Sequence, residues 1–210
     1  PREISTIYFG YIIASASVFC KSYHSIIKNK FNHLVDHFLP TLPTKPFLGI
    51  FMEPTEEAVG ISHKGYVWYE LKIDGLSAHG SRPEQGVNAI FPLSSALNEL
   101  ENINSELSKE EPHPYLGVPT LHPGMIQGGS AQSVIAAEAT LNWERRTLPG
   151  EQKEKLDFEL DRVIKAVENA PGNHIVSGTE IFSRPPNEVD GDEFIEKLCE
   201  VKGEKKYNGM

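Results

Sequence analysis

Apolar and polar side chains alternate along residues 66–74, which is the period of a half-buried β-strand. Three further segments have strand patterns, and they cover residues 118–127, 134–146 and 174–182. In residues 66–74 the inward face is predicted to carry Val67, Tyr69, Leu71 and Ile73, and the outward face Tyr66, Trp68, Glu70 and Lys72. In residues 134–146 the inward face is predicted to carry Ala139, Leu141 and Trp143, and the outward face Asn142, Glu144 and Arg146.

Two other segments, residues 88–107 and 151–169, carry apolar side chains at helical spacing. The apolar positions of the first are Ile90, Leu93, Leu97, Leu100, Ile103 and Leu107, and those of the second are Leu156, Leu160, Val163, Ile164 and Val167. Pro92 lies near the start of the first helix, where a missing amide donor costs little. Pro171 and Gly172 end the second.

The predicted order of elements is β-α-β-β-α-β, which indicates an α+β fold of the ferredoxin-like type. Such a fold has a four-stranded antiparallel sheet with two helices on one face. The other face would expose Tyr66 and Trp68, either as a contact surface or as scattered surface aromatics. We therefore predict one compact domain over residues 64–182, between an irregular segment 1–63 and a terminal segment 183–210.

The net charge of the chain makes some classes of function less favourable than others. The 210 residues include 20 Lys and Arg against 29 Asp and Glu, a net charge of −9 with neutral histidines. This balance argues against nucleic-acid binding, including the RNA binding of some ferredoxin-like domains, because such proteins need basic patches. The sequence contains 2 cysteines, too few for a disulfide framework, so we expect a reduced, cytoplasmic protein.

Residues 4–19 are largely apolar and include Ala14-Ser15-Ala16, a pattern shared by signal peptides and by buried core elements. The segment contains several Ser, Thr and Gly residues, and it is shorter than the about 20 residues that a membrane-spanning helix needs. We therefore favour a core element and expect no membrane partner.

Two residues have side chains suited to a hydrolytic site. Glu53 follows the apolar run 47–52, so it is either a metal ligand at the end of a buried strand or a turn-capping acid. His79 lies among small residues in the loop 75–86. It is sterically open to donate a hydrogen bond to an oxyanion, or it is a loop histidine that bonds its own backbone.

Three further features have two interpretations each. Gly128 and Gly129 allow close backbone approach, or they mark a β-bulge. Arg146 offers a planar fork that fits a carboxylate, or it is a surface arginine paired with Glu144. The pair His33 and His37 has the spacing of zinc ligands on a helix but lacks the glutamate of His-Glu-x-x-His, which favours a solvated helix face.

Together these motifs resemble one family in their order and spacing. The matching segments are Glu53-Pro54-Thr55, residues 63–68, residues 75–90, Gly128-Gly129-Ser130-Ala131 and Arg146 with Pro149-Gly150. The family is that of the co-catalytic zinc hydrolases that include acetylornithine deacetylase, succinyl-diaminopimelate desuccinylase, aminoacylase and carboxypeptidase G. The resemblance covers residues 47–190 and implies that the βαββαβ unit is a lid or dimerisation domain inserted into a zinc-binding α/β catalytic domain.

The resemblance also implies individual roles. Glu53 is similar to the family's zinc ligand, and His79 to the histidine that reaches the partner subunit's site and stabilises the oxyanion. Arg146 is similar to the arginine that holds the substrate's carboxylate, with Gly129 and Ser133 as further substrate-binding positions, although the family often has Asn where Ser133 stands. The implied reaction is metal-dependent hydrolysis of an amide bond in an N-acyl amino acid or peptide. Zinc is the implied cofactor, with cobalt as the alternative, and a second copy of the chain is the implied partner.

Most of the family's metal ligands have no counterpart in this sequence. No His-x-Asp and no Glu-Glu pair precedes Glu53, and no histidine follows Asp192. One glutamate cannot hold two zinc ions, because each needs about four ligands. We therefore expect the chain to be mainly the lid domain, with parts of the catalytic domain in 1–63 and 183–210, and to bind no metal alone. A non-catalytic dimerisation module or a degenerate copy is the alternative.

Overall fold

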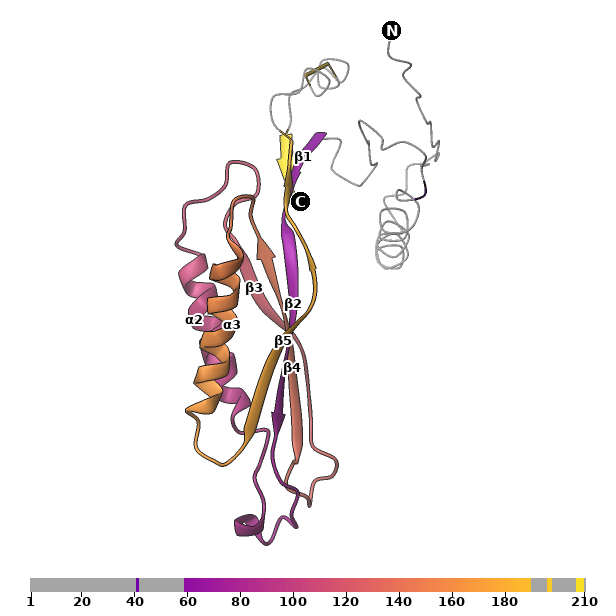
Figure 1. Ribbon diagram of the computed structural model, residues 1–210, viewed down its shortest axis with the longest axis vertical. Helices are drawn as coiled ribbons and strands as arrows, with labels where there is room; N and C mark the ends of the chain where they lie inside the picture. The colour runs from indigo at the N-terminus through magenta and orange to yellow at the C-terminus, as the bar shows by residue number, and fades with distance from the viewer. Residues whose placement is uncertain (1–40, 42–58, 190–195, 198–206, 210) are drawn as a thin grey trace. The chain divides into compact units, whose positions relative to one another are not determined.

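The computed structural model describes residues 41, 59–189, 196–197 and 207–209 (Figure 1). The predictions for residues 4–19, for Glu53 and for the pair His33 and His37 lie outside these described residues. In the described part, no helix has both the length and the apolar character needed to cross a membrane.

Four strands form one antiparallel sheet in the spatial order β3-β4-β2-β5. The strands are β2 (Gly65–Asp74), β3 (Thr120–Gly128), β4 (Glu138–Thr147) and β5 (Ile175–Arg184). Helix α2 follows β2 and helix α3 follows β4, so the order along the chain is β-α-β-β-α-β. The structure confirms the ferredoxin-like fold, and we call residues 65–184 the lid domain after their predicted role.

Helices α2 (Leu93–Leu107) and α3 (Lys153–Glu168) cover one face of the sheet (Figure 1). Between the two layers lie the apolar side chains that periodicity predicted to face inward, which include Val67, Tyr69, Leu71, Ile73, Leu100, Ile103, Leu141, Trp143, Val163 and Val167. The rings of Tyr69 and Trp143 stack across β2 and β4 with a centroid distance of 5.1 Å. Burial of this apolar surface is the main stabilising contribution to the domain.

The first helix begins later than its pattern predicted. The prediction started at residue 88 and placed Ile90 inward, but α2 begins at Leu93 and Ile90 is 42% exposed. The reason is local, because Pro92 occupies the position before the helix and Asn88 Oδ1 accepts the N–H of Ile90 at 2.8 Å. This side-chain bond forms a turn instead of a helical start.

The face of the sheet away from the helices carries an aromatic cluster of Tyr66, Trp68 and Phe182. Their ring centroids are 5.4–5.9 Å apart. The indole N–H of Trp68 donates to Glu144 Oε2 at 2.7 Å. The predicted outward orientation of Tyr66 and Trp68 is therefore correct, and these aromatic side chains pack together instead of lying singly.

The pairing of β2 with β4 gives the lid domain two distinct ends. The register runs without interruption from Gly65 opposite Thr147 to Asp74 opposite Glu138. We call the first end the base and the second the tip. At the base, β2 continues directly from β1 (Val59–His63), and β6 (Asn187–Glu188) follows β5. Strand β1 pairs with β6 and with β7 (Tyr207–Gly209) in a separate sheet. The predicted domain boundaries after residues 63 and 182 stay predictions.

Candidate functional site

The tip is a loop that returns on itself beyond the end of β2. Leu76 pairs with Val87 in an isolated antiparallel bridge, and His79 pairs in the same way with Val134. The N–H of Gly80 donates to the carbonyl of Ser133 at 2.7 Å. The segment before the first helix and the segment before β4 therefore hold each other at the tip, and His79 is exposed there.

Gly75 permits the close approach that starts this loop. A Cβ at residue 75 would overlap the carbonyl oxygen of Val87, which belongs to the backbone and cannot turn aside. We expect Gly75→Ala to lower the free energy of unfolding by about 1–3 kcal/mol, as measured by urea denaturation. The control is Gly124→Ala, whose Cβ would lie 3.7 Å from the nearest carbonyl and should change stability by about 0.5 kcal/mol or less. Equal effects of the two variants would contradict this account.

The imidazole of His79 contacts Ser81 in the same loop. Its Nδ1 lies 2.8 Å from Ser81 Oγ and accepts the backbone N–H of Ser81 at 3.2 Å. Both interpretations of this histidine thus have a structural counterpart, because the ring bonds its own loop on one side and is open on the other. Among the described residues, Nε2 of His79 has no hydrogen-bond partner.

Gly129 and Ser133 lie at the tip with His79. The carbonyl of Ser133 accepts from Gly80, next to the histidine, and Ser133 itself is exposed. Gly129 has a φ of +75°, a conformation that favours glycine, and its N–H donates to the carbonyl of Glu138 at 3.2 Å. The sequence grouped these two residues with Arg146, but the structure places both at the tip and brings Ser133 beside His79.

Arg146 lies at the base, on the outward face of the sheet. Arg146 of β4 lies opposite Tyr66 of β2 in the strand register, and Tyr66 lies opposite Arg184 of β5 on its other side. The guanidinium of Arg146 lies 5.5 Å from the centre of the Tyr66 ring, and that of Arg184 lies 4.7 Å from the centre of the Phe182 ring. Arg146 also forms an ion pair with Glu144 at 3.6 Å, which is the surface pairing that the sequence left open.

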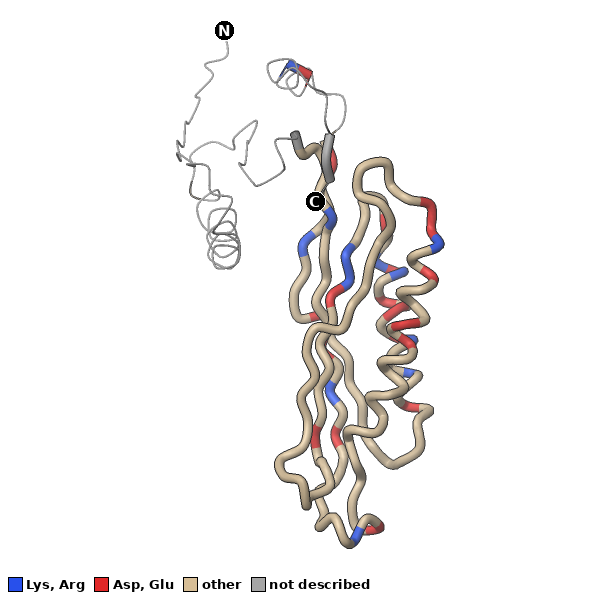
Figure 2. Tube along the Cα trace, turned by 180° about the vertical axis from the view of Figure 1, so that it is seen from behind, with Lys and Arg blue, Asp and Glu red and all other residues tan. Residues whose placement is uncertain are grey.

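The base carries Lys and Arg residues together with Asp and Glu residues (Figure 2). Besides Arg146 and Arg184 it contains Lys64, whose Nζ donates to the carbonyl of Val118 at 2.6 Å. Burial lowers the pKa of Lys64, and the positive charges of Arg146 and Arg145 lower it further. Two carboxylates partly balance these cations, because Glu144 pairs with Arg146 at 3.6 Å and Glu151 with Arg145 at 3.0 Å.

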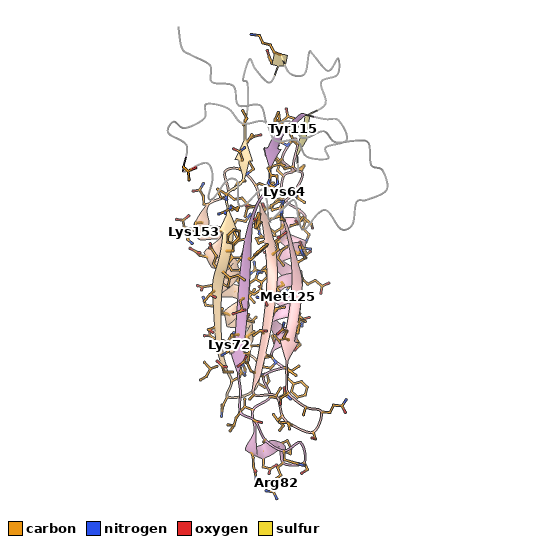
Figure 3. The ribbon with its side chains drawn as sticks, turned by 90° about the vertical axis from the view of Figure 1, so that its right-hand side faces the viewer. Lys64, Lys72, Arg82, Tyr115, Met125 and Lys153 are labelled. Atoms are coloured by element: carbon orange, nitrogen blue, oxygen red, sulfur yellow. The ribbon has the colours of Figure 1, made fainter. Side chains whose placement is uncertain are left out.

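Arg146 and His79 are far apart within one lid domain. From Tyr66, opposite Arg146, to Asp74 at the tip the strand rises about 26 Å, at about 3.3 Å per residue. Figure 3 shows Lys64 at one end of the sheet and Arg82, whose N–H donates to the carbonyl of His79, at the other end. One lid domain therefore cannot place both side chains on the same small molecule.

The sequence analysis did not identify three residues near these positions as candidate site residues, namely Ser81, Phe182 and Arg184. Alternation along β5 would have indicated that residues 182 and 184 share a face, but not that this face meets Tyr66 and Arg146. A register shift between Trp68 and Tyr69 further changes which residues of β5 pair with β2.

A metal site does not form within the described residues, since no three His, Cys, Asp or Glu side chains there come together as ligands. Glu53, the predicted zinc ligand, lies outside the described residues. The described donor set therefore does not fit a zinc ion.

The profile of the peptidase dimerisation domain of M20 peptidases matches residues 61–170. The chain belongs to this family, whose fold agrees with the four-stranded sheet and two helices of the lid domain.

Among its relatives are acetylornithine deacetylases. The chain is 37% identical to that of Vibrio atlanticus (strain LGP32) over 134 residues, which cover 63% of this chain and 35% of the relative. It is 28% identical to that of Buchnera aphidicola subsp. Schizaphis graminum over 172 residues, which cover 79% of this chain and 45% of the relative. The chain thus spans less than half the length of these curated relatives.

Solved structures share the fold at lower identity. A tripeptidase from Staphylococcus aureus has a TM-score of 0.52 and 20% identity over 72% of this chain and 39% of its own. A hydantoinase/carbamoylase-family amidase from Burkholderia multivorans has a TM-score of 0.54 and 18% identity over 73% of this chain and 36% of its own.

Proposed function

We propose that this chain provides the lid domain of a dimeric, metal-dependent hydrolase that cleaves an amide bond in N-acyl amino acids or peptides. The observation that carries the proposal is the separation of His79 at the tip from Arg146 at the base. A dipeptide-sized substrate extends over roughly 7 Å, far less than the lid domain. Two antiparallel lid domains, with the tip of one beside the base of the other, can present His79 of one copy and Arg146 of the other to the same substrate.

In this arrangement the two side chains have complementary tasks. The guanidinium of Arg146 binds the substrate's carboxylate through two parallel hydrogen bonds, and the ring of Tyr66 supports it from one side. His79 donates a hydrogen bond to the carbonyl oxygen of the scissile amide as negative charge develops there. Gly129 and Ser133 are proposed to contact the substrate beside His79. The short hydroxyl of Ser133 reaches less far than the amide that the family often has at this position.

The metal ion of the proposed enzyme requires ligands beyond the described residues. Zinc is the proposed ion, with cobalt as the alternative, and Glu53 is the proposed ligand from this chain. A non-catalytic dimerisation module is the second candidate function, and it is supported by the lack of three gathered ligand side chains in the described part. A chimera that joins this lid domain to the catalytic domain of the Vibrio atlanticus acetylornithine deacetylase distinguishes the two, because a lid domain that serves catalysis allows the chimera to release acetate and a non-catalytic module does not.

The proposed partner is a second copy of the chain, bound along the edge strand β3. Met125 and Ile126 on this strand are 57% and 52% exposed, and the strand contains no Lys, Arg, Asp or Glu that would oppose edge pairing. The opposite edge, β5, contains Glu180 and Arg184. A two-fold pairing of identical strands is antiparallel, so it brings the tip of one lid domain toward the base of the other.

We expect Ile126→Lys to weaken self-association of the 210-residue chain by at least about tenfold, measured by sedimentation equilibrium. The substitution brings two like charges together near the proposed two-fold axis and removes apolar contact area. Ile175→Lys is the matched control, because Ile175 is 70% exposed but lies on β5 at the opposite edge. A dimer that dissociates with Ile175→Lys and persists with Ile126→Lys would contradict the choice of β3, and a chain that stays monomeric at high concentration would contradict the partner.

A further inference from the structure

Ser81 is the only residue whose polar atoms lie within hydrogen-bond distance of the His79 ring among the described residues. Two of its groups point at the same ring nitrogen. Its hydroxyl oxygen is 2.8 Å from Nδ1 of His79, and its backbone nitrogen is 3.2 Å from Nδ1. Neither group contacts Nε2.

The backbone group decides the direction of these hydrogen bonds. A peptide N–H can only donate, so Nδ1 must accept and carries no proton. A neutral imidazole has one donor and one acceptor nitrogen, and its proton therefore lies on Nε2. The Ser81 hydroxyl rotates freely and donates to Nδ1 in the same sense.

We propose that Ser81 is a positioning residue that selects the Nε2–H tautomer of His79 and so presents a hydrogen-bond donor outward from the tip. This role rests on the oxyanion function proposed above. The exposed Nε2–H then donates to the developing oxyanion without a change of tautomer and without proton transfer. A ring that carried its proton on Nδ1 would present an acceptor outward, which would repel the oxyanion.

Nuclear magnetic resonance of the full chain labelled with nitrogen-15 histidine tests the proposal at a pH where the ring is neutral. His79→Asn assigns the His79 signals among the 8 histidines. We expect the proton of wild-type His79 on Nε2. We expect Ser81→Ala, which loses the hydroxyl donor, to raise the ratio of the Nδ1–H to the Nε2–H tautomer about twofold to tenfold.

Two variants separate this role from a general effect on the loop. Ser81→Thr keeps a hydroxyl and should restore the wild-type ratio, whereas Ser77→Ala removes an exposed hydroxyl two residues from His79 on the other side and should leave the ratio unchanged. A proton on Nδ1 in the wild type, or an unchanged ratio in Ser81→Ala, would overturn the proposal. A chain that stays monomeric while His79 keeps its Nε2–H tautomer would refute the proposed dimeric function and leave the tautomer assignment standing.

Discussion

Replacement of Arg145 by methionine is expected to lower the free energy of unfolding by about 3–5 kcal/mol. The Arg145 side chain is fully buried, and it donates to both carboxylate oxygens of Glu159 at 2.9 and 3.1 Å and to Glu151 at 3.0 Å. Burial has the largest single effect and lowers the pKa of Arg145, but the hydrogen bonds and negative charges of Glu159 and Glu151 together outweigh it and raise the pKa above its ordinary value. Since Glu159 is also buried, loss of the arginine leaves a buried carboxylate without its partner.

Urea denaturation of three variants isolates the cause. Arg162→Met is the matched control, because Arg162 forms ion pairs with Glu99 and Glu106 in a more exposed position and should cost roughly 1 kcal/mol or less. The double variant Arg145→Met with Glu159→Leu removes both charges and should recover most of the stability that the single variant loses. A double variant no more stable than Arg145→Met would refute this explanation.

The expected effect of His79→Ala on catalysis is a loss of about 10²- to 10³-fold in kcat, since the substitution removes one oxyanion donor. The measurement uses a chimera in which the lid domain of this chain replaces the corresponding lid of the Vibrio atlanticus acetylornithine deacetylase. Glu84→Ala is the control, because Glu84 lies in the same tip loop, is exposed and has no proposed part in the site. A His79→Ala chimera as active as the Glu84→Ala chimera would remove the proposed catalytic role.

Mixed dimers test whether His79 acts on its partner's substrate. One subunit carries His79→Ala with an intact catalytic domain, and the other carries an intact lid domain with an inactivated catalytic domain. If His79 acts across the dimer, each mixed dimer regains one working site, because the intact tip of the second subunit serves the first. If His79 serves its own subunit, mixing restores no activity, and the proposed antiparallel arrangement of the two lid domains is wrong.

Most of the lid fold follows from local periodicity. Alternation over residues 66–74 and 139–146 and helical spacing over 151–169 indicate which side of each element is buried, and the order of the elements then leaves the ferredoxin-like fold as the simplest arrangement. The start of α2 was missed because a single side-chain bond from Asn88 competes with the helix, and a hydrophobic pattern does not report such a bond.

Continued by one step, the alternation of Ala139, Leu141 and Trp143 would place Arg145 inward, and the structure buries it. A charged residue at a buried position requires partners, and these lie on the loop that follows β4 and on α3. Glu151 and Glu159 are 6 and 14 residues away in the chain, so the turn after β4 brings Glu151 to the guanidinium and the packing of α3 on the sheet brings Glu159. The hydrophobic pattern therefore indicates that residue 145 is buried, but it does not indicate which carboxylates pair with the buried arginine.

The sequence by itself determined the order and the buried faces of the elements, and its motifs named His79 and Arg146 as candidate functional residues. Only the tertiary structure decided which candidates lie together. Gly129 and Ser133 are closer in sequence to Arg146 than to His79, yet strand β4 carries Arg146 to the base while the loop pairing keeps Ser133 beside His79 at the tip. Burial patterns depend on near neighbours in the chain, whereas strand pairing and its register join residues that are distant in sequence, and the distances within a site depend on that pairing.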